Sequence, residues 1–335
     1  MKTFACFSLA VLLTFIVSIN SYANRPYPVR PITNTVVWSA GGGTDSINRM
    51  LMAEMSKDLG VRINVVNKTG GVAGSIGMNA TLRKRADGYN LVGISSSNVV
   101  ASVNGGWKQK FDVWTPYIMG SSPDVVSVPI DSPYNSLQEL IDASKTKSLK
   151  AAAGGTGGIH HIYLLELEKA AGVSFKFIPY PGSAPSQTAA ITKEVDLVIT
   201  SMAEQAALLR GKKLRPLAML HPKDYELEDV GTIVSAFKTF PALSERLPLS
   251  QALGFAINSK APQNVKDKLG EAFKKALASE KVQQWAKQNH YELSGLYGEA
   301  AEEEFARLES IFTWALDDLG ANKISPASFG IPKPE

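Results

Sequence analysis

The sequence has very little cysteine: its 335 residues include only Cys6. This cysteine lies within an N-terminal segment, residues 1–23, that has the three parts of a secretory signal. These parts are Lys2, an apolar stretch over residues 4–19 and the small-x-small cleavage site Ser21-Tyr22-Ala23. Removal of the segment leaves a mature chain with no disulfide, no thiol nucleophile and no thiolate metal ligand. We therefore predict an exported protein that an ordinary hydrophobic core stabilises.

The chain also lacks a second long apolar run and an excess of charge of one sign. No later stretch approaches the roughly 20 apolar residues that a membrane span needs. Lys and Arg number 35 against 31 Asp and Glu, and the two signs are interspersed. The densest basic cluster, Arg83-Lys84-Arg85, has no aromatic platform beside it and is typical of a solvated helix end. These absences argue against nucleic acid and membrane surfaces as partners.

The length and the pattern of elements predict an α/β protein of two domains. A mature chain of about 310 residues exceeds the length over which one hydrophobic core usually grows. Short apolar strands alternate with helical patterns in both halves, which is typical of parallel sheets. The expected strands lie at residues 33–39, 61–65, 91–94, 149–153, 175–179, 195–200 and 214–220, with one more within 251–265. The last expected helices lie over residues 265–278, 282–288 and 300–319.

The order of these elements predicts a chain that crosses twice between the domains, near residues 125–129 and 248–254. Domain 1 is then discontinuous, with residues 24–124 and 250–335, and domain 2 comprises residues 125–249. Each domain is expected to contain a mostly parallel sheet flanked by helices. Because ligands bind beyond the carboxyl ends of such strands, we expect a ligand cleft between the domains.

A run of three glycines, Gly41-Gly42-Gly43, joins the first expected strand to its helix. Such a run lets several backbone N–H groups converge on one point, and the helix start adds a partial positive charge. The run has no GxxxxGK[ST] phosphate loop, and Ser46 stands at the third position of a dinucleotide fingerprint. The second strand ends in Asn67 rather than in an acidic residue. A carboxylate is therefore the expected anion.

A second glycine-rich loop, "AAGGTGGIHH" at residues 152–161, follows a strand in the other half. Two facing loops, one from each domain, would clamp an anion. Glycine loops between a strand and a helix are also common structural turns, and this remains the alternative interpretation of each loop. Asp45 has two interpretations as well: an acidic residue favoured in the first helical turn, or a contact with a ligand amine or hydroxyl.

The adjacent histidines His160 and His161 suggest catalysis or metal binding, but their surroundings argue against both. Neighbours on a helix point about 100° apart, and no second ligand stands at the i+4 spacing that a zinc site on one helical face needs. No serine elbow and no paired carboxylates accompany them. We expect His161 to pack or bond near the cleft. Trp285, Phe312 and Trp314 are expected to face the core.

Several segments, taken in order, resemble one family of proteins. They are "RPYPVRPITNTVVWSAGGGTDSINRMLMAEMSKDLGVRINVVNKTGGVAGSIG", "ADGYNLVGISSS", "HHIYLLELEKAAGVSFKFIPYPGSAPSQ", "EVDLVI" and "GKKLRPLAML". The ordered set runs through nearly the whole mature chain and is similar to the periplasmic solute-binding receptors of tripartite tricarboxylate transporters, the TctC or Bug family. The resemblance implies a two-domain periplasmic binding protein fold, type II-like, that closes on a small carboxylate. Backbone amides, hydroxyls and bridging waters would hold that ligand.

The resemblance also implies a set of ligand-binding residues in each domain. In domain 1 they are Trp38, Ala40, Gly41, Gly42, Gly43, Thr44, Asp45, Ser95, Ser96 and Ser97. In domain 2 they are Gly155, Thr156, Gly157, Gly158, His161, Tyr180, Gly182, Ser183, Pro185, Ser201 and Ala203. The chain departs from the family at Val37-Trp38, where Pro-Phe is usual, and at Gly158, where serine is usual. Trp38 either faces the pocket and narrows it or packs beneath the glycine loop.

The function that the resemblance implies is solute binding rather than catalysis. The expected protein is a periplasmic monomer that binds a small carboxylate and delivers it to the membrane components of a tripartite tricarboxylate transporter. No cofactor, metal or nucleic acid is expected. Two alternatives stay open: a secreted enzyme that uses the same cleft, and a sensor that presents its ligand to a membrane kinase. An enzyme would need a nucleophile with a base, an acid–base pair or a metal.

Overall fold

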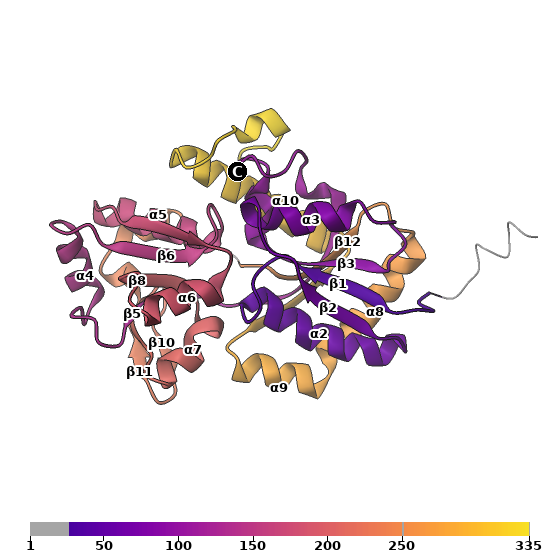
Figure 1. Cartoon of the computed structure of the whole chain (residues 1–335), viewed down its shortest axis with the longest axis horizontal. Coiled ribbons are helices and arrows are strands. Elements are labelled where there is room, and N and C mark those ends of the chain that lie inside the picture. The colour runs from indigo at the N-terminus through magenta and orange to yellow at the C-terminus, as the bar shows by residue number, and fades with distance from the viewer. Residues whose placement is uncertain (1–26, 250, 335) are drawn as a thin grey trace, which may run out of the picture.

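The computed structural model describes residues 27–249 and 251–334, which form two α/β domains side by side (Figure 1). The expected signal segment, residues 1–23, and Cys6 lie outside the described residues. Each domain is built on one main sheet with helices packed against it. In the described part of the chain, no helix combines the length and the apolar character needed to cross a bilayer.

The first domain contains a six-stranded sheet with the order β13-β4-β12-β3-β1-β2. Its strands are β1 (Ile32–Val36), β2 (Ile63–Asn67), β3 (Asn90–Ser95), β4 (Trp114–Ser121), β12 (Leu253–Asn258) and β13 (Glu292–Tyr297). Its helices are α2 (Gly43–Leu59), α3 (Ser75–Leu82), α8 (Gln263–Ala278), α9 (Glu280–Gln288) and α10 (Glu299–Asp318).

Helix α2 illustrates how the sequence produces this packing. Ile47, Leu51 and Met55 recur at helical spacing and are fully buried in one apolar cluster. Phe273 of α8 belongs to the same cluster. Burial of each such side chain contributes about 1.5–3 kcal/mol. The helix ends at Gly60, whose φ of 66° is the left-handed conformation that glycine adopts without strain.

The second domain contains a five-stranded sheet with the order β7-β6-β8-β5-β9. Its strands are β5 (Asp124–Pro129), β6 (Lys150–Gly154), β7 (Lys176–Tyr180), β8 (Leu197–Ser201) and β9 (Leu214–Met219). Its helices are α4 (Leu137–Ser144), α5 (Ile159–Ala171), α6 (Ser183–Ile191) and α7 (Met202–Arg210). A separate hairpin joins β10 (Tyr225–Leu227) to β11 (Gly231–Ile233).

Each sheet contains the expected set of parallel strands and, in addition, antiparallel pairs, so both sheets are mixed. In the first sheet β1 pairs in parallel with β2 and β3, whereas β12 and β13 form antiparallel pairs. In the second sheet β6 pairs in parallel with β7 and β8, whereas β5 is antiparallel to both neighbours. The crossings explain why β5 and β12 are antiparallel to their neighbours. Each begins where the chain enters from the other domain, beside the cleft, and therefore runs away from it. The parallel strands run toward the cleft and end there.

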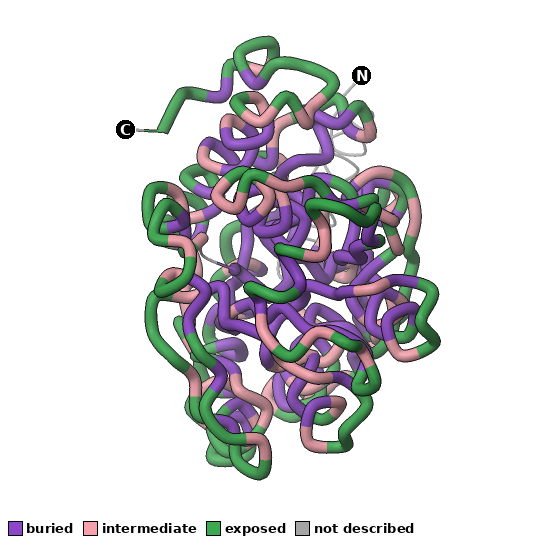
Figure 2. The backbone as a smooth tube through the Cα atoms, turned by 90° about the vertical axis from the view of Figure 1, so that its left-hand side faces the viewer, coloured by how far each residue is buried: buried purple, intermediate pink, exposed green. Residues whose placement is uncertain are grey.

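The two crossing segments lie together between the domains. The first is the short link between β4 and β5, so the expected crossing at residues 125–129 is instead part of β5. The second leads into β12, and its Gln251 Oε1 accepts a hydrogen bond from the N–H of Ser122 on the first link at 3.2 Å. Figure 2 shows that buried residues run through the centre of the molecule, with exposed residues on the outer loops. The carboxyl ends of β1, β3, β6, β7 and β8 therefore face the interface between the domains.

Candidate functional site

A small cavity lies between the domains, where the carboxyl ends of their strands meet. Its volume is about 20 Å³, which is room for about one water molecule. The residues that line it come from both domains and from the second crossing segment: Trp38, Gly42, Gly43, Thr44, Ser95, Ser97, Gly154, His160, Gly182, Ser183, Glu204, Gln251 and Leu253. The domains are closed on each other, and a ligand of several heavy atoms requires them to separate.

The glycine run places the start of helix α2 at this cavity. Gly42 is the N-cap and Gly43 is the first helical residue. Gly41 turns the chain with a φ of 82°, a conformation that would strain any residue with a side chain. The first four N–H groups of a helix have no partner within the helix. The first domain therefore presents backbone donors to the second.

A carboxylate of the protein itself already contacts these donors. The N–H of Gly43 donates to Oε1 of Glu204 at 2.6 Å, across the interface between the domains. The other oxygen, Oε2, accepts hydrogen bonds from the N–H of Ser201 at 3.0 Å and from its hydroxyl at 2.8 Å. Ser201 and Glu204 form the capping box of α7. The Glu204 carboxylate thus joins the N-termini of two helices from different domains, where both helix dipoles favour a negative charge.

Three further side chains extend from Glu204 into the second domain. His160 Nε2 lies 3.7 Å from Glu204 Oε2, and His160 Nδ1 lies 2.6 Å from Asp124 Oδ2. The hydroxyl oxygen of Ser183 lies 3.4 Å from His160 Nε2. Asp124, His160 and Ser183 are the residue types of an acyl-transfer triad. They come from the starts of β5, α5 and α6, which lie far apart in the sequence, so no local sequence motif predicts that they meet.

The charge state of His160 does not suit a general base. Burial by itself would lower the pKa of His160, but the charge and hydrogen bond of Asp124, with the charge of Glu204, outweigh burial and raise it to about 8. The imidazole is therefore mainly protonated at pH 7, whereas a general base must be unprotonated to accept the proton of Ser183. His160 thus lies between the carboxyl groups of Asp124 and Glu204, and burial raises the pKa of Asp124.

His161, the histidine that the sequence analysis selected, has a different environment. Its Nδ1 accepts a hydrogen bond from the N–H of Gly157 at 2.9 Å. Its ring stacks on Phe177 with the ring centres 3.9 Å apart. Burial lowers the pKa of His161 to about 4, so the ring is neutral at pH 7. His161 supports the second glycine loop from within its own domain, and His160 is the one that lines the cavity.

Asp45 also bonds within its own domain. It accepts hydrogen bonds from the N–H of Gly41 at 3.0 Å and from Asn67 at 2.8 Å. Its carboxylate also pairs with Arg49 at 2.9 Å. Asp45 is buried and does not line the cavity. In this closed arrangement its carboxylate fixes the turn of the first glycine run.

The structure brings only part of the predicted binding set to the cavity. The predicted residues that line it are Trp38, Gly42, Gly43, Thr44, Ser95, Ser97, Gly182 and Ser183. Those that do not line it are Ala40, Gly41, Asp45, Ser96, Gly155, Thr156, Gly157, Gly158, His161, Tyr180, Pro185, Ser201 and Ala203. Their contact with a ligand stays a prediction. Lining residues that the sequence analysis did not name are Gly154, His160, Glu204, Gln251 and Leu253. The Ser-x-x-Glu signature of a capping box directly after a strand would have drawn attention to Glu204.

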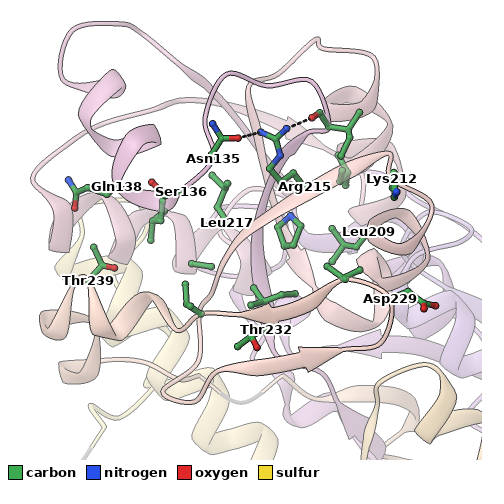
Figure 3. Close-up of a pocket in the computed structure, with 18 residues that line it drawn as sticks. Asn135, Ser136, Gln138, Leu209, Lys212, Arg215, Leu217, Asp229, Thr232 and Thr239 are labelled. Atoms are coloured by element: carbon green, nitrogen blue, oxygen red, sulfur yellow. Dashed lines mark hydrogen bonds between the residues drawn. The ribbon is translucent and has the colours of Figure 1, made fainter.

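A larger cavity lies elsewhere, on the second domain between β9, β11 and the start of α4 (Figure 3), and has a volume of about 520 Å³. Arg215 points into it, but its guanidinium already donates to Asn135 Oδ1 at 2.9 Å and to the carbonyl of Ile130 at 2.6 Å. It also donates to the carbonyls of Ser132 and Tyr134. This arginine therefore holds the loop before α4 rather than an anion. Across residues 27–249 and 251–334, no cluster of His, Cys, Asp and Glu side chains could hold a metal ion.

Trp38 lies at the contact between the domains. Its side chain lines the cavity, and the indole N–H donates to Asn98 Oδ1 at 3.3 Å. A Cβ added to Gly155 of the second domain would lie 3.0 Å from the indole ring. The indole therefore packs closely against the second glycine loop. A change in the separation of the domains changes the surroundings of this ring.

Ligand binding is accordingly expected to change the tryptophan emission, and Trp38→Phe is expected to remove most of that change. The chain has five tryptophans, so the matched control is Trp314→Phe. The Trp314 indole N–H bonds to the carbonyl of Ile331 at 3.2 Å, away from the cavity. Fluorescence titration of both variants measures the effect. A full response and an unchanged ligand ranking in Trp38→Phe would mean that Trp38 only packs beneath the loop.

Comparison with known proteins identifies a family whose sequences match this chain. The family model described as "Tripartite tricarboxylate transporter family receptor" matches residues 47–303. Among curated proteins, the chain is similar to the "UPF0065 protein in tcbD-tcbE intergenic region" of Pseudomonas sp. (strain P51). The two are 27% identical over 275 residues, which is 78% of each chain.

Solved structures share the fold of this chain. The periplasmic binding protein BugD superposes with a TM-score of 0.80 at 24% identity, over 88% of this chain and 99% of BugD. The R. palustris protein Rpa4515 with adipate superposes with a TM-score of 0.79 at 20% identity, over 89% of this chain and 99% of that protein. At this level of identity the similarity establishes a shared two-domain fold.

Proposed function

The chain belongs to the tripartite tricarboxylate transporter receptor family, and from this premise we propose that it captures a small carboxylate between its two domains and delivers it to a membrane transporter. The protein is a solute-binding receptor and not an enzyme. The adipate held by Rpa4515, a protein of the same fold, supports a carboxylate as the ligand class.

One observation carries the proposal: backbone and hydroxyl donors from both domains converge on the cavity. Helix α2 begins there from one side, and α6 and α7 begin there from the other. Ser95, Ser97 and Ser183 add hydroxyl groups. None of the described residues that line the cavity is a lysine or an arginine. Helix N-termini and hydroxyls complement an anion without such side chains.

Binding is proposed to proceed by opening and closing of the two domains. Residues 27–121 with 253–334 form one moving body, and residues 124–249 form the other. The short link between β4 and β5 and the segment before β12 serve as the hinge, as in other receptors that close around a ligand. The small volume of the closed cavity supports this proposal, because a ligand cannot enter without separation of the domains.

The proposed location is the periplasm, which the protein reaches through the signal at residues 1–23. It acts there as a monomer and passes its ligand to the membrane components of a tripartite tricarboxylate transporter. Membership of the receptor family supports this assignment.

A thermal-shift screen of the mature protein tests the proposal. Mono-, di- and tricarboxylates, aromatic acids and amino acids are each added at increasing concentration. A true ligand at 100 times its Kd is expected to add about 2.7 kcal/mol to the free energy of unfolding. The corresponding amides and alcohols, which lack a carboxylate, are the matched controls. Stabilisation by a neutral amide as strong as by its acid would contradict carboxylate binding.

A further inference from the structure

The carboxylate of Glu204 is held by its own domain. Its Oε2 accepts two hydrogen bonds from Ser201, which lies in the same turn of the chain. The side chain is only 5% exposed, and His160 Nε2 lies 3.7 Å from Oε2. Both neighbours belong to the second domain. Separation of the domains leaves these contacts intact, so an entering ligand meets Glu204 in this same position.

Separation of the domains breaks one bond of Glu204, the bond from the N–H of Gly43 to Oε1. When a ligand fills the cleft and the domains close around it, two groups are left in need of new partners. The N–H of Gly43 needs an acceptor, and Glu204 Oε1 needs a donor. A buried polar group without a partner is costly, so a ligand that satisfies both groups binds better than one that satisfies only one.

A carboxylate without further substituents satisfies only the first group. Its oxygens accept from the N–H of Gly43, but it has no hydrogen to donate to Glu204 Oε1. Two carboxylates brought together also repel each other. A ligand with a donor on the carbon next to its carboxylate replaces both partners, with the acceptor toward α2 and the donor toward Glu204.

The charges around Glu204 favour a cationic donor over a neutral one. Glu204 and Asp124 are both carboxylates, and His160 is the one basic side chain among the described residues that line the cavity. Burial raises the pKa of Asp124, so the negative group that faces the ligand is Glu204, whose Oε1 is directed toward α2. A protonated amine complements that carboxylate, and a charge-assisted hydrogen bond is stronger than the bond that a hydroxyl makes.

We propose that Glu204 determines the specificity of the cleft, and that the ligand is a small carboxylate with a protonated amine beside the carboxylate group. The proposal rests on the proposed function and narrows its ligand class. The ligand carboxylate binds at the start of α2, and its amine binds Glu204 Oε1.

Calorimetric titration of the mature protein with matched trios of acids tests this proposal. Each trio contains an unsubstituted, a 2-hydroxy and a 2-amino acid: propionate, lactate and alanine; succinate, malate and aspartate; glutarate, 2-hydroxyglutarate and glutamate; 3-phenylpropionate, phenyllactate and phenylalanine. In a trio that binds, the amino acid is expected to bind about tenfold or more tightly than the unsubstituted acid. Glu204→Gln is expected to remove that preference, because the amide presents no charge to the amine.

The matched control is Glu139→Gln. Glu139 stands at the equivalent position of α4, three residues after the N-cap Ser136, and its Oε2 accepts from the N–H of Asn135 at 2.8 Å, but it lies outside the cavity. This variant is expected to keep the wild-type preference. A wild-type protein that binds the unsubstituted acid best overturns the proposal, as does a Glu204→Gln protein that keeps the amino preference. If no acid of any trio binds the folded wild-type protein, the proposed function itself is overturned, which is a separate result.

Discussion

Replacing Gly182 with alanine is expected to weaken ligand binding about tenfold to a hundredfold, because it adds a methyl group where the two domains meet. A Cβ at Gly182 would lie 2.4 Å from Oγ of Ser39 and 3.2 Å from the Ser39 nitrogen. Ser39 belongs to the first domain, and its N–H donates to the carbonyl of Pro181 in the second at 3.3 Å. The variant is therefore expected to close poorly on its ligand. Small-angle scattering should show a smaller ligand-induced decrease in radius of gyration than in the wild type.

Backbone strain is the competing explanation for such a loss, because Gly182 has a φ of 140°. The double variant Gly182→Ala/Ser39→Gly keeps that strain and removes the side chain with which the new methyl group collides. Recovery of affinity in the double variant is expected. Gly172→Ala is a second control, since Gly172 has a φ of 66° and no atom within 4 Å of an added Cβ. If the double variant does not recover affinity, the loss of affinity comes from backbone strain rather than from the collision.

The free energy of unfolding is expected to fall as the pH decreases from about 6.5 toward 4, with a contribution from His161 of up to about 3 kcal/mol. The pKa of His161 is about 4 in the folded protein, below the ordinary value of 6.5, because the ring is buried. In this pH window the unfolded chain binds a proton that the folded chain does not, so acid favours unfolding. Urea unfolding of the mature protein at a series of pH values measures this slope. His161→Phe, which can still stack on Phe177, is expected to remove the His161 part of it.

His160 provides an internal control, because its contribution to the free energy of unfolding depends on pH in the opposite direction. Its pKa is raised to about 8 in the folded protein, so its stabilising contribution is complete below pH 6.5 and is lost as the pH rises through 8. His160→Gln is expected to remove the alkaline part of the pH dependence. An acid slope in His161→Phe equal to that of the wild type would show that His161 titrates normally.

The sequence predicted β1, β2, β3, β6, β7, β8, β9, β12 and the last three helices, and it missed β4, β5, β13 and the short hairpin of β10 and β11. Ile47, Leu51 and Met55 identified α2 because their spacing is a property of one helix. β4 and β5 were not identified as strands, since β5 is buried along its whole length and shows no alternation of apolar and polar residues. β13 was missed because it pairs only at the edge of the first sheet, beside β4.

Apart from Trp38, the predicted residues that line the cavity contribute backbone groups and small side chains. The glycine run, Ser95 and Ser97 lie at the ends of strands that can be recognised from their own sequence, and the structure brings them to the cavity. His161 was chosen over His160 because a helical pattern does not say which of two neighbours faces another domain. Glu204 was not chosen because its partner, the N–H of Gly43, lies 161 residues away in the chain.

The sequence by itself determined that this protein is a two-domain α/β receptor with helix starts and glycine loops at the ends of its strands. Only the tertiary structure decided that Glu204 faces α2, and that His160 stands between Asp124 and Glu204 at the closed cavity. The reason is physical. The conformation of a glycine loop or a helix start depends on neighbours within a few residues, so a local sequence pattern predicts it. The contacts of side chains across a cleft depend on the strand order of two mixed sheets and on how two domains close. No local sequence pattern predicts the strand order or the closure.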